Sequence, residues 1–161
     1  MFVFLCINLV LVYFLGKYSK NSRNFAIFAS VIKIVYENMI ETGLKYTSEL
    51  TITDATTAIA MGSGDMPVLA TPMMMALMEN AAMLAVKDEL PEGCTTVGGH
   101  MESSHLKPTK VGDTVRATAE VTKVDGKKIE FRVTAYSGET LLGEGTHLRF
   151  VVDKDKFMSR L

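Results

Sequence analysis

The stretch that decides the fold is residues 68–89, VLATPMMMALMENAAMLAVKDE. Between residues 66 and 86 the only side chain with a formal charge is Glu79, and most of its neighbours are methionine, alanine, leucine or valine. A helix that is apolar on every side is typical of a protein interior. Thr71 and Pro72 form a good helix start, with Thr71 as the N-cap and Pro72 at the first helical position. We therefore predict a buried helix that begins at Thr71 and carries Glu79 two turns along.

The length and composition indicate one ordered domain. The chain has 161 residues, of which 48% are hydrophobic and 22% are charged, a balance typical of globular proteins. Its 17 basic and 18 acidic residues nearly cancel, whereas nucleic-acid-binding domains carry a clear basic excess. The two cysteines, Cys6 and Cys94, form no zinc or disulfide framework, and no histidine pair has the His-x-x-x-His spacing of a metal site. We therefore expect no metal and no nucleic-acid partner.

Residues 1–38 differ from the rest of the chain and have three interpretations. They contain the apolar run MFVFLCINLVLVYFLG, the polar stretch KYSKNSRN and a second apolar run. A membrane anchor is one interpretation, although sixteen helical residues span about 24 Å and the hydrocarbon core is about 30 Å thick. A signal peptide is weaker, because a basic start and a convincing cleavage site are missing. The third is a translated upstream leader rich in residues with AT-rich codons, which makes Met39 the true start. We accordingly separate an apolar extension, residues 1–38, from a domain, residues 39–161.

The segments on either side of the helix have the composition of antiparallel strands. Apolar and polar side chains alternate in residues 114–124 and 129–136, and Asp125-Gly126 between them is a hairpin signal. The extended segments that we predict are 44–53, 56–61, 94–106, 114–124, 129–136 and 141–152. In the last of these, we expect Leu142, Leu148, Phe150 and Val152 to lie in phase on one face. A strand, a buried helix and then long strands predict an α+β fold in which a curved antiparallel sheet wraps a long central helix.

Several short pieces of sequence follow one another in a characteristic order along these elements. They are Thr71 with Glu79 eight residues later, Gly98, His105 ahead of the turn at Pro108 and Gly112, and the segment GTHLR at 145–149. Over about residues 44–158 this order resembles the hotdog fold of acyl-CoA thioesterases and dehydratases. Within that fold it is most similar to the fluoroacetyl-CoA thioesterase family.

The resemblance implies the residues of a catalytic site. The family's catalytic threonine, glutamate and histidine correspond to Thr71, Glu79 and His105. Its glycine and arginine that line the site correspond to Gly98 and Arg149. The family's sites lie between two subunits, which implies a homodimer, with a dimer of dimers as an open alternative. The fluoroacetate-specific enzyme also has an aromatic lid residue before the helix; residues 62–65 read GSGD here, which removes the basis for expecting a fluoroacetyl preference.

Each candidate residue also has a purely structural interpretation. Thioester hydrolysis needs an activated nucleophile, a proton carrier and donors for the oxyanion. Thr71 is the candidate nucleophile or water-positioning residue, and it is also the expected helix cap. His105 is the natural general base or acid because an ordinary histidine pKa is about 6.5, with His100 and His147 as competitors for this role. Its structural interpretation is a histidine held by hydrogen bonds to its neighbours.

The remaining site residues carry similar pairs of interpretations. Glu79 is a candidate base, nucleophile or partner of His105, or else a buried carboxylate with a structural partner. Gly98-Gly99 either lets the substrate approach the backbone or forms a β-bulge. Arg149 either binds the substrate or points outward from its strand.

We therefore predict a hotdog-fold acyl-CoA thioesterase that hydrolyses a small acyl-CoA to a free acid and coenzyme A. It needs no cofactor, because coenzyme A is part of the substrate. We expect a cytoplasmic homodimer, or a membrane-tethered enzyme if residues 1–38 are an anchor. One alternative is a non-catalytic acyl-CoA-binding or sensing hotdog protein. Another is a hotdog hydratase or dehydratase, which usually has an aspartate and a histidine close together in a characteristic segment.

Overall fold

The computed structural model describes residues 40–161, so the predictions for residues 1–38 lie outside the described part of the chain. Its elements are β1 (Lys45–Thr51), η1 (Asp54–Thr56), α3 (Thr71–Ala85), η2 (Lys87–Glu89), β2 (Cys94–His105), β3 (Thr114–Asp125), β4 (Lys128–Ser137), β5 (Thr140–Asp153) and α4 (Lys154–Met158). Among residues 40–161, no helix is both long and apolar enough to cross a membrane.

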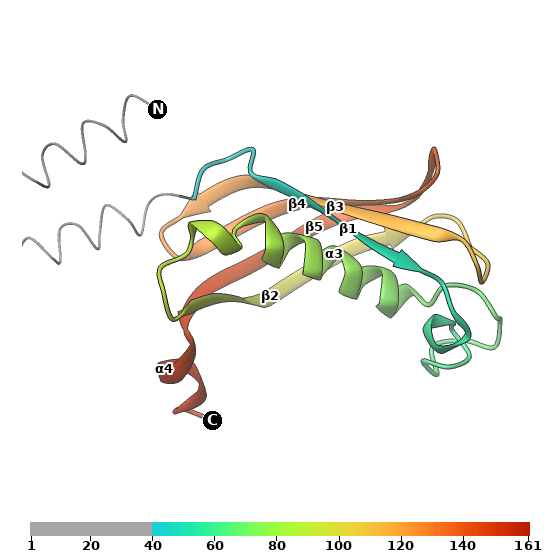
Figure 1. Ribbon diagram of the computed structural model, residues 1–161, viewed down its shortest axis with the longest axis horizontal. Coiled ribbons are helices and arrows are strands. Elements are labelled where there is room, and N and C mark those ends of the chain that lie inside the picture. The colour runs from blue at the N-terminus through green and yellow to red at the C-terminus, as the bar shows by residue number, and fades with distance from the viewer. Residues whose placement is uncertain (1–39) are drawn as a thin grey trace, which may run out of the picture. The chain divides into compact units, whose positions relative to one another are not determined.

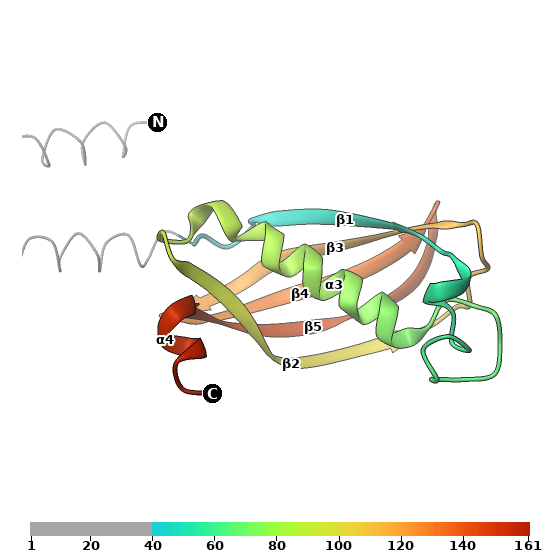
Figure 2. The same ribbon diagram turned by 60° about the horizontal axis from the view of Figure 1, so that its bottom comes forward.

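The five strands form one antiparallel sheet in the order β1-β3-β4-β5-β2. Helix α3 lies across one face of this curved sheet, and the loop between β1 and α3 gathers at the N-terminal end of the helix (Figures 1 and 2). The β3–β4 hairpin forms where the sequence predicts it, and its loop consists of Gly126 and Lys127. Gly126 has a φ of 57°, which glycine adopts without steric cost in tight hairpin turns. The predicted α+β architecture is confirmed.

One face of α3 and the concave face of the sheet make the core. The fully buried helix residues share one stripe and are Met74, Met78, Ala81 and Ala82. The facing residues of β3 and β4 follow the predicted alternation and are Val115, Ala117, Ala119, Val121, Ile129, Phe131, Val133 and Ala135. The opposite side of α3 is partly or fully exposed in the single chain. The prediction of a helix buried on every side is therefore wrong for one chain, because a single sheet covers only one side of it.

The last strand departs from its expected phase. Ala135 pairs with Gly143 and Tyr136 with Leu141, so Leu142 is an extra residue in β5. Such a bulge changes which side chains face the core. Leu142 is buried, but beyond it the inward positions belong to His147 and Arg149. The expectation for Leu148, Phe150 and Val152 is wrong, and Phe150 is 38% exposed on the other face.

Residues 56–61 do not form the predicted strand. They contain the end of η1 and a series of turns, with a single bridge from Thr57 to Leu69. Ile59 and Met61 are 54% and 45% exposed. The reason is that no neighbouring strand offers this segment a continuous ladder, so local turn hydrogen bonds replace it, such as Met61 N–H to the Thr57 carbonyl at 3.0 Å.

Candidate active site

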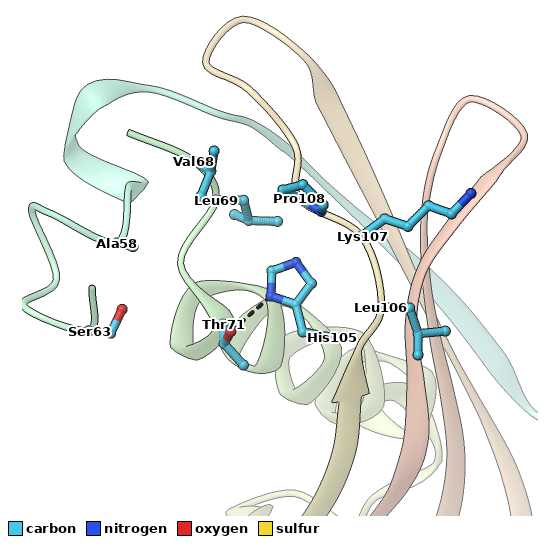
Figure 3. A pocket seen from close by; sticks show the side chains of 9 residues that line it. All are labelled: Ala58, Ser63, Val68, Leu69, Thr71, His105, Leu106, Lys107 and Pro108. Carbon is cyan, nitrogen blue, oxygen red and sulfur yellow. Dashed lines mark hydrogen bonds between the residues drawn. The ribbon is translucent and has the colours of Figure 1, made fainter. Parts of the chain in front are cut away.

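A threonine and a histidine face each other at the N-terminal end of α3. Thr71 is the first residue of the helix and His105 is the last residue of β2. Thr71 Oγ1 lies 2.8 Å from His105 Nδ1, and Figure 3 shows this hydrogen bond. The N-cap is Ala70, and no side chain caps this helix end, so the prediction that the Thr71 hydroxyl is a cap is wrong. The hydroxyl is paired with an imidazole instead, which is the geometry in which a base can take its proton.

The Thr71–His105 pair forms part of the wall of a pocket with a volume of about 290 Å³. The lining residues are Ala58, Ser63, Val68, Leu69, Thr71, His105, Leu106, Lys107 and Pro108, drawn in Figure 3. The wall is mainly apolar, and the Lys107 side chain extends away from His105. This volume is near the lower end of small-molecule sites, about 300 to 1,000 Å³. His105 Nε2 is buried and has no hydrogen-bond partner within residues 40–161.

Glu79 lies two turns further along α3, beside Gly98 and His147. Its side chain is 45% exposed, so it is less buried than the apolar sequence around it predicts. Glu79 Oε1 lies 3.8 Å from His147 Nε2. A Cβ atom at Gly98 would lie 3.1 Å from this carboxylate oxygen and 3.3 Å from His147 Cε1. The absence of a side chain at Gly98 therefore keeps space open beside the Glu79 carboxylate.

The Gly98-Gly99 pair also forms a bulge, so both interpretations of these glycines apply. The register between β2 and β5 shifts between Gly98 and His100. A Cβ atom at Gly99 would lie 2.6 Å from the Phe150 ring, on the opposite face from Glu79. Gly98 thus faces the helix, whereas Gly99 packs against the outer face of the sheet.

Arg149 points inward and is 7% exposed, so its outward interpretation is excluded. Its Nε donates to Thr96 Oγ1 at 2.8 Å and its Nη2 donates to the Thr96 carbonyl at 2.7 Å. Its Nη1 lies 3.1 Å from His147 Nε2 and 3.5 Å from the Glu79 carbonyl. Burial lowers the pKa of the guanidinium, which still remains a cation at neutral pH. Arg149 therefore connects β5, β2 and α3.

The structure brings the predicted residues together in two groups. Thr71 and His105 form one group, whereas Glu79, Gly98 and Arg149 belong to the other. Eight helical residues separate the two groups by about 12 Å along α3. The sequence analysis names His147 only as a competitor of His105 for the role of general base, and it does not name Thr96. The sequence does indicate that His147 belongs with Arg149, because residues two apart on a strand share one face. Among residues 40–161, no group of three or more His, Cys, Asp or Glu side chains is placed to hold a metal ion.

The chain is similar in sequence to known proteins. Residues 52–155 match the family described as fluoroacetyl-CoA-specific thioesterase. The fluoroacetyl-CoA thioesterase of Streptantibioticus cattleyicolor is 36% identical over 94 residues, which are 58% of this chain and 68% of that protein.

Solved structures show the same similarity. A fluoroacetyl-CoA thioesterase has a TM-score of 0.71 and 29% identity, covering 76% of this chain and 96% of its own. A thioesterase superfamily member from Thermus thermophilus has a TM-score of 0.71 and 28% identity, covering 76% and 91%. A hot-dog-like protein from Thermanaerovibrio acidaminovorans shares the fold at 22% identity, with a TM-score of 0.70 and coverage of 78% and 93%. The predicted hotdog fold is confirmed.

Proposed function

We infer that this chain, which belongs to the fluoroacetyl-CoA-specific thioesterase family, hydrolyses a small acyl-CoA to a free acid and coenzyme A. The structural observation that carries this function is the Thr71–His105 hydrogen bond in the wall of a 290 Å³ pocket. A hydroxyl paired with an imidazole in the wall of an open, mainly apolar pocket is the arrangement that acyl transfer needs. Coenzyme A enters as part of the substrate, and side chains of the protein carry the proposed chemistry.

We propose that His105 moves the proton in the reaction. The Thr71 hydroxyl either attacks the thioester carbonyl itself or holds the attacking water, and in both cases the proton passes to His105. A carbon–oxygen bond forms, the carbon–sulfur bond breaks, and the proton on His105 passes to the departing thiolate of coenzyme A. When Thr71 attacks, a water then cleaves the acyl ester on Oγ1, gives its proton to His105, and Oγ1 takes that proton back. On either route one water is consumed overall. An imidazole suits this role because its ring nitrogens can both accept and donate a proton.

Glu79 completes the site in this proposal, and it comes from a second copy of the chain. Within one chain Glu79 lies about 12 Å along α3 from Thr71. The outer edge of β2 pairs with no other strand of residues 40–161, and an unpaired edge is a template for another strand. If two β2 edges pair antiparallel about a two-fold axis at Glu102, with Gly99 as the bulged residue, Gly98 of one copy lies opposite His105 of the other. Glu79 lies against Gly98, so its carboxylate arrives beside the Thr71–His105 pair.

Three further features belong to the same proposal. No phenylalanine, tyrosine or tryptophan lines the pocket, so we propose a small acyl group without a requirement for fluorine. Cys94 is a free thiol, which supports a cytoplasmic location because thiols persist there. The partly exposed apolar side of α3 offers a surface for a dimer of dimers.

Release of free thiol from a panel of acyl-CoAs tests the function. We expect release from short-chain substrates, and a loss of about 10²-fold or more in Glu79→Gln and His105→Ala. Glu139→Gln makes the same chemical change in the exposed β4–β5 loop and should behave as wild type. If the wild type binds acyl-CoA but releases no thiol, the protein is a binding module and the proposed function is wrong.

A further inference from the structure

His147 is a buried histidine that the proposed reaction does not use. The residue is 2% exposed and lies on the inward face of β5. Its ring centroid lies 6.3 Å from that of Phe131 on β4, inside the core. Three polar groups surround it: the His100 carbonyl, the Arg149 guanidinium and the Glu79 carboxylate. A polar side chain at a core position costs stability unless it has a structural or functional use.

The hydrogen bonds of His147 define its tautomer. Nδ1 lies 2.6 Å from the His100 carbonyl, which only accepts, so Nδ1 carries a proton and donates. Nε2 lies 3.1 Å from Arg149 Nη1, which only donates, so Nε2 has no proton and accepts. The ring is therefore neutral. Burial lowers the pKa of His147, and the neighbouring Arg149 cation acts in the same direction, which agrees with a neutral ring.

Through Arg149 this ring reaches the main chain of α3 at Glu79. Arg149 Nη1 contacts both His147 Nε2 and the Glu79 carbonyl, while the other donors of Arg149 hold Thr96 on β2. The guanidinium fork is rigid and planar, so fixing one nitrogen fixes the others. His147 Nε2 also lies 3.8 Å from the Glu79 carboxylate. The position of Glu79 thus depends on a neutral acceptor at residue 147.

We propose that His147 is a positioning residue for thioester hydrolysis, a role that rests on the proposed function. Its neutral ring accepts from Arg149, which holds the Glu79 turn of α3 to β2 and keeps the carboxylate beside Gly98. Protonation of Nε2 removes this acceptor, and the new N–H of His147 then faces the N–H of Arg149 Nη1. The titratable and charged groups that face the ring are Glu79 from α3, Arg149 from β5 and His100 from β2. Loss of the neutral ring therefore lowers the rate of hydrolysis without removing a group that contacts the substrate.

Two amide substitutions separate this role from simple packing. The amide of His147→Gln reaches the position of Nε2, where its oxygen accepts from Arg149. The shorter amide of His147→Asn reaches only the position of Nδ1, where it donates to His100 but leaves Arg149 without its acceptor. We expect His147→Gln to keep kcat within about threefold and His147→Asn to lose about 10²-fold, because misplacing a group by 1 Å costs that much. KM should change little in both. Thr146→Val, on the exposed face of the same strand, is the matched control.

The pH profile supplies a second readout. Because Gln does not titrate, His147→Gln should lose the part of the acid limb of kcat that comes from residue 147, whereas a purely packing role would leave the profile unchanged. The proposal is wrong if His147→Asn matches wild type, or if the Gln and Asn variants lose the same activity.

The tautomer can be measured without activity. Imidazole ¹⁵N NMR of the full chain should show a neutral ring with the proton on Nδ1 at pH 7. A proton on Nε2, or a charged ring at pH 7, overturns the arrangement. If the wild type hydrolyses no acyl-CoA, the proposed function fails, and the catalytic role of His147 fails with it, whereas the tautomer still tests the hydrogen-bonded arrangement.

Discussion

Replacing Thr71 with valine separates catalysis from stability at the start of α3. Valine keeps the shape of the side chain but removes the hydroxyl that lies 2.8 Å from His105 Nδ1. Loss of a positioned proton-transfer partner costs about 10²- to 10⁴-fold in rate, which corresponds to about 3 to 5 kcal/mol of activation free energy. We expect a kcat loss in this range, measured as thiol release from a short acyl-CoA.

The stability of the same variant should change far less. The Thr71 hydroxyl does not cap the helix, so the cap penalty of about 0.5 to 2 kcal/mol does not apply. What remains is one exposed hydrogen bond, worth about 1 kcal/mol. Urea unfolding should show a loss of about this size, and Thr71→Ser should restore most of the activity. A Thr71→Val enzyme that hydrolyses within a few-fold of wild type would refute the role of the hydroxyl.

Three further predictions follow from the packing and the charges. Met78→Ala should lower the free energy of unfolding by about 2 to 5 kcal/mol, since Met78 is 0% exposed, whereas Met66→Ala at a 59% exposed position should change it little. Gly145→Ala should destabilise the β2–β5 pairing by about 1 to 3 kcal/mol in urea unfolding, because the new Cβ overlaps the Glu102 carbonyl. His147 is neutral when folded and its pKa is lowered, so below pH about 6.5 the unfolded chain binds more protons. Stability should therefore fall as the pH drops through this range, and less steeply in His147→Gln.

Each of these predictions has a contradicting outcome. Equal unfolding free energies for Met78→Ala and wild type would show that α3 does not pack as described. A Gly145→Ala protein as stable as wild type would mean that β2 and β5 are not in this register. Parallel stability curves for wild type and His147→Gln between pH 5 and 7.5 would show that the buried ring does not carry the expected proton linkage.

The sequence predicts most of the fold because the periodicity of apolar residues and the turn motifs are local features of the sequence. The alternation in β3 and β4 identifies their core faces, and Asp125-Gly126 identifies the hairpin. The phase of β5 was not predictable, because the bulge at Leu142 depends on pairing with β4. Apolar residues such as Leu148 suggest an inward face, yet His147 and Arg149 occupy it because they satisfy each other's hydrogen bonds. A pattern based on hydrophobicity cannot find such a face.

The site was predictable in its residues but not in its arrangement. Thr71 and His105 are 34 residues apart, and the sequence alone does not show that their side chains meet at 2.8 Å. The Thr71 signal for a helix cap was misleading, because the helix begins one residue earlier than the Thr-Pro pattern predicts and His105 takes the hydroxyl. Glu79 was expected to lie buried beside them, but one chain places it with Gly98 and leaves it half-exposed. In our account, the Thr71–His105 pair beside which Glu79 acts therefore belongs to a second copy of the chain.

Complementation between two inactive variants tests this account most directly. His105→Ala and Glu79→Gln are co-expressed with different tags, the mixed species is purified, and thiol release from a short acyl-CoA is measured. If each site combines His105 of one copy with Glu79 of the other, one of the two sites in every mixed dimer is intact. The mixed dimer should then recover about half of the wild-type rate, by the symmetry of a two-site dimer. If each site lies within one chain, every site carries a substitution, and a mixed dimer no more active than its parents would contradict the account.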